Sequence, residues 1–140
     1  MVADLFAQSL EGSNFQEAWI EGDASARWRS ASGHGPNAGA RASGSSLLEV
    51  EPGNRLPRHT DSAEETIVVV DGTASVVLDD EPDMVSAGGV ALIPEDAPHE
   101  VRNAGDETLR FVAVYADTDV LTTYEEEVQP DGSRERQTVG

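Results

Sequence analysis

Four side chains in two separate stretches of the sequence are of the kinds that bind metals or transfer protons. His59, Asp61 and Glu65 lie close together, and His99 follows in a second stretch. Alternate residues of an extended segment point to one face, so His59 and Asp61 share a face, and Glu65 joins them if the segment stays extended. Burying such groups together is costly without a cation or strong pairing. The pattern therefore predicts a functional site.

The chemistry that these side chains offer is that of a mononuclear metal centre. Two imidazoles and two carboxylates suit Fe(II), Mn(II), Ni(II) or Zn(II). Two carboxylates also neutralise a divalent charge and favour the harder ions, so Fe(II) is the first choice. The candidate ligands are His59, Asp61, Glu65 and His99. Glu65 is also a candidate catalytic base, because a carboxylate beside a cation can shuttle protons.

A purely structural interpretation of the same residues stays open. The two histidines could be hydrogen-bonded core residues, and Asp61 could orient a ligand without binding the ion itself. Glu65 could pair in the core with Arg55, Arg58 or Arg102.

Short strands separated by glycine and proline turns are expected to position these side chains. The β-branched run 66–70 and the following Asp71-Gly72 predict a hairpin whose return strand is 74–78, with an acidic turn at 79–83. Regular spacing of such strands is typical of an all-β sandwich or barrel. Further strands are predicted at 47–50, 84–85, 90–93, 100–102 and 109–115.

The two stretches resemble, in order, the two sequence motifs of the cupin family. The first motif spaces a glycine, two histidines, a glutamate and a glycine, and the second spaces a glycine, a proline, a glycine, a histidine and an asparagine. The positions here have the same spacing: Gly53, His59, Asp61, Glu65 and Gly72, then Gly88, Pro94, Asp96, His99 and Asn103. The resemblance covers residues 46–115. It implies a single-domain jelly-roll barrel, the cupin double-stranded β-helix, with a metal held by the four candidate ligands.

Two positions depart from the family pattern. Asp96 replaces a glycine, and because aspartate tolerates turn geometry this change is expected to alter only a turn. Asp61 replaces the second histidine of the first motif. With Asp61 in that position the site could keep its metal, change it or lose it.

Two arginines, Arg102 and Arg110, are candidate substrate-binding residues because a guanidinium can orient an anionic substrate. The His59-x-Asp61 pair with His99 also resembles the facial triad of iron/2-oxoglutarate oxygenases, where Arg110 would suit a carboxylate clamp. Those enzymes are usually longer, and the glycine and proline framework here is that of a small cupin. Arginines beside many acids also commonly pair with them.

The amino-acid composition excludes some classes of binding partner. The 140 residues carry a formal charge of −18, nine arginines and no lysine or cysteine. Without clustered cations such a surface does not bind nucleic acid or anionic membranes. No apolar run is long enough to cross a bilayer, and the N-terminus lacks the basic start of a secretory signal, so a cytoplasmic protein is expected.

The chain divides into three parts of one domain. Residues 1–45 are predicted to form an N-terminal arm and a glycine-rich loop that pack on the barrel, 46–116 the cupin core, and 117–140 a C-terminal hairpin or tail. Unpaired strand edges need cover, and small cupins commonly dimerise, so a homodimer is expected.

The resemblance implies a metal-dependent enzyme acting on a small polar organic molecule, with an oxygen-dependent oxygenase first. A metal-dependent lyase or isomerase is the next alternative. A cupin that binds a small ligand or metal without catalysis is a third.

Overall fold

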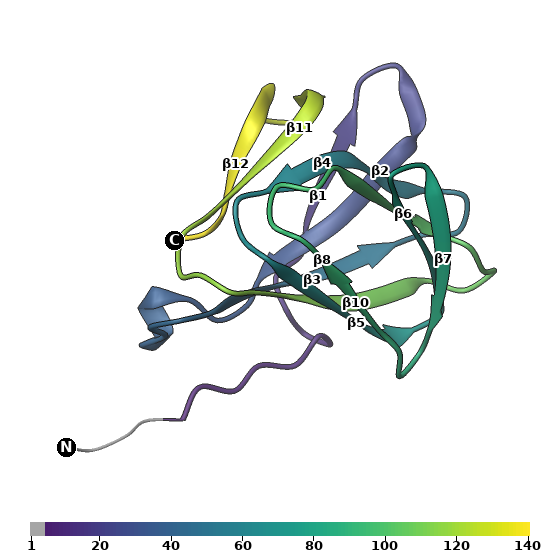
Figure 1. Ribbon diagram of the computed structural model, residues 1–140. Helices are drawn as coiled ribbons and strands as arrows, with labels where there is room; N and C mark the ends of the chain where they lie inside the picture. The colour runs from purple at the N-terminus through teal and green to yellow at the C-terminus, as the bar shows by residue number, and fades with distance from the viewer. Residues whose placement is uncertain (1–4) are drawn as a thin grey trace.

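Strands form almost all of the regular structure between residues 5 and 140, the part of the chain that this computed structural model describes (Figure 1). The described residues contain no α-helix and one 3-10 turn, η1 (Pro36–Ala38). The strands are β1 (Gln16–Ile20), β2 (Asp23–Ser32), β3 (Gly44–Val50), β4 (Arg55–Asp61), β5 (Glu65–Asp71), β6 (Thr73–Leu78), β7 (Glu81–Ser86), β8 (Val90–Ile93), β9 (His99–Asn103), β10 (Leu109–Tyr115), β11 (Val120–Val128) and β12 (Ser133–Val139).

The strands wrap into a jelly-roll barrel. Pairing runs in the order β7-β6-β9-β4-β2-β3-β10-β5-β8, so strands distant in the sequence lie side by side. All these pairs are antiparallel except the short parallel contact of β2 with β4. The predicted all-β cupin-type barrel is confirmed.

Alternating side chains on the central strands fill the barrel. On β5, Ile67 and Val69 are almost completely buried, and on the neighbouring β10 the same holds for Phe111 and Ala113. The period of two follows from the strand pleat, which sends successive side chains to opposite faces. This apolar interior forms the floor beneath the polar site described below.

The Asp71-Gly72 turn does not close the predicted hairpin. β5 pairs with β10 and β8, whereas β6 pairs with β7 and β9, so the chain crosses at Gly72 from one side of the barrel to the other. Gly72 has a φ of 81°, and a Cβ there would lie 3.1 Å from the carbonyl oxygen of Thr108. Glycine is thus required by a crossover, although its sequence context resembles that of a hairpin.

The acidic turn predicted at 79–83 is shorter than expected. β7 already begins at Glu81, and only Asp79 and Asp80 connect it to β6. Both have positive φ, at 51° and 62°. Two-residue hairpin loops favour this conformation because it matches the twist of the flanking strands, and aspartate tolerates it better than most residues.

The C-terminal hairpin predicted from the sequence is confirmed. β11 and β12 pair antiparallel, and β11 also pairs with β4 (Figure 1). The hairpin therefore lies beside the strand that carries the first sequence motif. Near the N-terminus, β1 pairs with β2, and β2 pairs with β3, so residues 16–32 add to the sheet.

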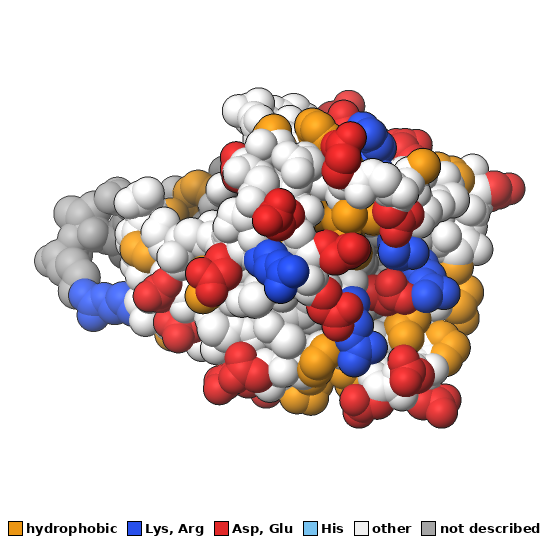
Figure 2. Space-filling view, turned by 90° about the horizontal axis from the view of Figure 1, so that it is seen from above, with side chains coloured by type: hydrophobic (Ala, Val, Ile, Leu, Met, Phe, Trp, Pro, Cys, Tyr) orange, Lys and Arg blue, Asp and Glu red, His pale blue; other side chains and the backbone are white. Residues whose placement is uncertain are grey.

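Acidic side chains dominate the face seen in Figure 2, with arginines interspersed among them. Among the described residues, six arginines lie within 4.0 Å of a carboxylate, and most of these pairs are partly exposed. Exposed pairs of this kind contribute little stability each. No helix in residues 5–140 has the length and apolar character that a bilayer span requires.

Candidate metal centre

All four predicted ligands meet inside the barrel. His59 and Asp61 lie on β4, Glu65 opens β5 and His99 opens β9. One donor atom of each residue lies within 4.8 Å of the donor atoms of the other three. No side chain of the four exposes more than 3% of its surface. Residues separated by up to forty positions thus form one buried polar cluster.

The segment from His59 to Glu65 does not remain extended, as the shared-face argument assumed. β4 ends at Asp61, the chain bends through 62–64, and Glu65 begins a strand that pairs with β8 and β10. Glu65 therefore approaches the cluster from another strand. Glu64 is exposed while Glu65 is buried, because the strand pleat resumes at Glu65.

Antiparallel pairing of β4 with β9 brings the two histidines together. His59 is the register partner of His99, and an irregularity between Leu56 and His59 shifts the register just before them. Their ring centroids are 4.2 Å apart. Directly opposed residues of antiparallel strands are the closest cross-strand neighbours, so this pairing places both imidazoles in one site.

Both imidazoles have a fixed tautomer. Nδ1 of His59 lies 2.7 Å from the carbonyl oxygen of Pro57, and Nδ1 of His99 lies 2.9 Å from that of Ala97. A carbonyl oxygen only accepts, so each Nδ1 carries the hydrogen and donates it. In its neutral form, each ring of this tautomer directs the lone pair of Nε2 into the cluster, the arrangement found for metal-binding histidines.

Asp61 has one oxygen held and one left without a partner. Its Oδ1 accepts a hydrogen bond of 2.6 Å from the Thr122 hydroxyl on β11. Its Oδ2 is buried without a hydrogen-bond partner, 3.6 Å from Nε2 of His59 and 3.5 Å from Nε2 of His99. A buried unpaired carboxylate oxygen is costly. A cation bound by these atoms would satisfy it, and neighbouring ligands about 2.1 Å from one ion are separated by about 3 Å.

Glu65 and His99 need a proton or a cation between them. Oε1 of Glu65 lies 3.0 Å from Nε2 of His99, and neither atom has a hydrogen to donate when the carboxylate is ionised and the imidazole neutral. Burial raises the pKa of Glu65 to about 7. Burial opposes the charged form of His99, yet the bond to Glu65 raises its pKa overall. Burial lowers the pKa of His59 to about 4, which keeps that ring neutral. The donor set therefore fits a divalent ion.

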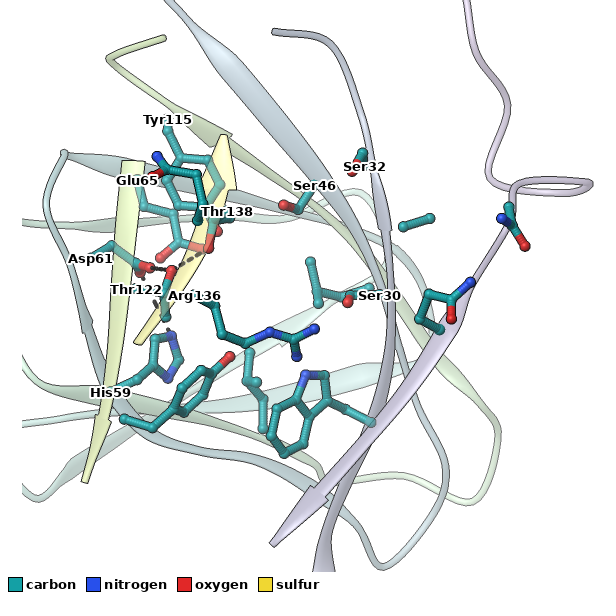
Figure 3. Close-up of a pocket in the computed structure, with 18 of the residues that line it drawn as sticks. Ser30, Ser32, Ser46, His59, Asp61, Glu65, Tyr115, Thr122, Arg136 and Thr138 are labelled. Atoms are coloured by element: carbon teal, nitrogen blue, oxygen red, sulfur yellow. Dashed lines mark hydrogen bonds and ion pairs between the residues drawn. The ribbon is translucent and has the colours of Figure 1, made fainter. Parts of the chain in front are cut away.

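A cavity of about 400 Å³ opens beside three of the four ligands, His59, Asp61 and Glu65 (Figure 3). Hydroxyl groups and aromatic rings supply much of its wall. Trp28 and Tyr124 have ring centroids 5.5 Å apart, and Tyr124 also lies 5.3 Å from the His59 ring. Burial raises the pKa of both Tyr115 and Tyr124, so their phenols stay protonated. The lining includes Gln16, Trp28, Ser30, Ser46, Leu48, His59, Asp61, Glu65, Tyr115, Thr122, Tyr124, Arg136 and Thr138.

Arg102 and Arg110 are not brought to this cavity. Arg102 is about half-exposed and pairs with Glu100. Arg110 lies on β10, with its Nε 2.7 Å from Oε2 of Glu49. Neither is among the cavity-lining residues. Their placement matches the alternative in which they pair with neighbouring acids.

Five cavity residues that the sequence interpretation missed come from the C-terminal hairpin: Thr122, Tyr124, Arg136, Gln137 and Thr138. Thr122 and Tyr124 alternate on β11, and Arg136 lies on β12 opposite Thr122. The available signal was the strand-forming run 120–124 (Val-Leu-Thr-Thr-Tyr), which predicts a strand but not which of its faces points inward.

Thr122 is expected to strengthen metal binding by orienting Asp61. In Thr122→Val the Asp61 carboxylate loses the donor that holds Oδ1, so its Oδ2 is no longer directed at the cluster. The affinity for Mn(II), measured by calorimetry, should fall about 10- to 100-fold. This is the usual effect in metalloproteins of removing a residue that hydrogen-bonds to a metal ligand. Thr123→Val, on the opposite face of β11, is the control and should bind normally. Unchanged affinity in Thr122→Val would contradict this role.

The jelly-roll barrel and its buried histidine and carboxylate cluster define a small β-barrel protein with a candidate mononuclear metal centre. The family model of the cupin domain matches residues 46–115, which is half of the chain. This protein belongs to the cupin family.

Two curated relatives come from Streptomyces. Protein SchB of Streptomyces halstedii is 38% identical over 76 residues, covering 54% of this chain and 55% of SchB. The polyketide synthase CurC of Streptomyces cyaneus is 37% identical over 75 residues, covering 53% of this chain and 49% of CurC. The match therefore spans about half the length of each relative.

Solved structures of oxalate decarboxylase from Bacillus subtilis share the fold, including one of a form with Mn(II) centres. The similarity has a TM-score of 0.59 and 26% sequence identity, and it covers 64% of this chain and 26% of the decarboxylase. The resemblance is thus to one part of a larger protein.

Proposed function

We propose that this protein is a mononuclear metal-dependent enzyme that acts on a small polar organic molecule, with oxygen-dependent oxidation as its reaction. The observation that carries the proposal is the buried Oδ2 of Asp61, which lacks a hydrogen-bond partner and lies 3.5–3.6 Å from two Nε2 atoms. The cavity beside it gives a substrate access to the same point. A merely structural cluster would leave neither the orphaned oxygen nor the adjoining space.

The proposed ion is Fe(II) or Mn(II). His59, His99, Asp61 and Glu65 supply two nitrogens and two oxygens, a mixture that suits these metals. Mn(II) gains support from the Mn(II) centres of the related oxalate decarboxylase. When bound, such an ion would supply Lewis acidity and the redox capacity that oxygen chemistry requires.

The chain's own residues would bind and orient the substrate. Hydroxyls of Ser30, Ser46 and Thr138 line the cavity and can bond to substrate oxygens. The Tyr124 phenol can donate, because burial raises its pKa and keeps it protonated. Glu65 would take up a proton next to the substrate only after leaving the ion, since a carboxylate beside a cation can then serve as a base.

Two relatives guide the choice of substrate and the alternative reaction. The polyketide synthase CurC supports an oxygen-rich organic substrate connected with polyketide assembly. The oxalate decarboxylase supports a second candidate function, a metal-dependent lyase that cleaves a carbon–carbon bond without net oxidation.

The proposal is tested by metal analysis followed by oxygen uptake. Protein purified without added metal should contain about one Fe or Mn ion per chain. With a panel of small oxygenated organic acids and phenols it should consume oxygen. Product formation with metal but without oxygen would favour the lyase. Protein that lacks metal, and whose melting temperature ignores chelator and added ions, would contradict a metalloenzyme and leave a ligand-binding cupin.

A further inference from the structure

One cationic side chain lines the cavity among the residues that the structure describes, and it is Arg136. No carboxylate of residues 5–140 lies within 4.0 Å of it, whereas six other arginines each have such a partner: Arg27, Arg29, Arg55, Arg58, Arg102 and Arg110. Arg41 and Arg134 also have no such partner in the described residues, but neither lines the cavity. The chain has 27 acidic residues for nine arginines. An arginine left free in that excess, and placed inside a cavity, is available to an anion from outside.

Strand register fixes Arg136 in line with the metal site. Arg136 is the register partner of Thr122, and Thr122 is the partner of Asp61, so the three residues follow one row across β12, β11 and β4. In Figure 3 the Arg136 guanidinium extends into the cavity toward Ser30, away from Asp61 and Glu65. The cavity is therefore lined both by a cationic group and by three of the proposed metal ligands.

Two aromatic rings line the same cavity as Arg136. The rings of Trp28 and Tyr124 line the cavity, with an angle of 31° between their planes. Such surfaces bind a flat apolar body, while a planar guanidinium matches a carboxylate through two parallel hydrogen bonds. The net charge of −18 repels anions at long range, so anion binding here must come from a local group.

We propose that Arg136 makes this cavity a binding site for an aromatic carboxylate, with the carboxylate on the guanidinium and the ring against Trp28 and Tyr124. This substrate class rests on the proposed function, because it places the substrate beside the metal ligands. Arg136 belongs to the hairpin outside residues 46–115, so the specificity would come from a segment beyond the family match.

Calorimetric titration with benzoate and with its neutral analogue benzamide tests the inference. Benzoate should bind the Mn(II)-loaded protein more tightly than benzamide. Arg136→Gln should lose at least about tenfold in benzoate affinity, the scale of one charge-assisted contact, and keep its benzamide affinity. Arg136→Lys should fall in between, because it keeps the charge but loses the fork. Arg134→Gln is the matched control, since Arg134 is exposed on the same strand and outside the cavity.

Equal benzoate affinities in Arg136→Gln and Arg134→Gln would overturn the inference, and so would benzamide binding as tightly as benzoate. Repeating the titration on chelator-treated protein separates the two proposals, because a carboxylate can also bind a metal directly. Protein that takes up no metal, yet binds benzoate in an Arg136-dependent way, would contradict the proposed metalloenzyme and support this site. If the chelator-treated protein no longer prefers benzoate over benzamide, and Arg136→Gln has no effect, then the carboxylate binds through the metal. That result would overturn the Arg136 site and support the proposed metalloenzyme.

Discussion

Replacing His99 with alanine is expected to abolish the binding of one divalent ion. His99 is 1% exposed, and its Nε2 lies 3.5 Å from Asp61 and 3.0 Å from Glu65, so its removal takes one donor of four from the centre of the cluster. The two carboxylates would then face each other with one imidazole, and their repulsion would favour protonation over metal uptake. Mn(II) binding, measured by calorimetry and by metal content after dialysis, should fall by at least about 1,000-fold, since a metal-ligand loss exceeds the 10- to 100-fold effect of a supporting residue.

Two further variants separate lost ligation from lost folding. His99→Gln retains most of the side-chain volume and should keep the melting temperature of the metal-free protein closer to that of the parent, yet it should still fail to bind. His34→Ala removes the histidine that bonds to Ser43 and Ser45, away from the cluster, and should bind normally. Normal metal content in a folded His99 variant would reject the ligand set proposed here.

The convergence of the four ligands could be predicted because the motif spacing encodes it. His59 and Asp61 share a face by strand parity, and His99 opens the strand that pairs with theirs. The same parity argument failed for Glu65, which reaches the cluster only because the chain bends at 62–64 and enters another strand. Local alternation predicts which side chains point inward, but it does not predict where a strand ends.

The hairpin contribution could not be predicted because it depends on pairing between distant strands. Thr122 bonds to Asp61 across 61 positions, and Arg136 enters the cavity only through the register of β12 on β11. No motif spans that separation. The prediction of a hairpin at Asp71-Gly72 was wrong for a related reason. The local sequence suits a hairpin, but the topology requires the chain to cross to another part of the barrel.

Asp61, which replaces a histidine of the family motif, is oriented by the C-terminal hairpin that lies beside it. A histidine is oriented by its own Nδ1 bond to the backbone, as in His59 and His99. An aspartate side chain has no nitrogen that could bond to the backbone in this way. A hydrogen-bond donor from another residue must therefore hold one of its oxygens. Thr122 supplies that donor, and the other oxygen then faces the two Nε2 atoms.

The affinity for a divalent ion is expected to rise with pH and to level off above pH 7. Glu65 must lose its proton to bind a cation, and burial raises its pKa to about 7. At least one proton then competes with the metal, because the pKa of His99 is raised as well, so affinity should fall at least about tenfold per pH unit below 7, or at least about 100-fold at pH 5. Calorimetry in two buffers of different ionisation enthalpy should detect the proton released at pH 6. Affinity that is flat from pH 5 to 8 would contradict the competition.

The metal-free protein should show the opposite trend in stability. The raised pKa of Glu65 gives stability that is fully present below the unfolded value of 4.5 and is lost as pH rises to about 7. The lowered pKa of His59 acts on the acid side, where stability is lost as pH falls from 6.5 to about 4. A bound ion replaces the proton of the cluster and removes the loss caused by Glu65. Mn(II) should therefore raise the melting temperature more at pH 8 than at pH 5, and Glu65→Gln should remove most of the alkaline loss in the metal-free protein. Equal stabilisation by Mn(II) at both pH values would show that metal binding displaces no proton from the cluster.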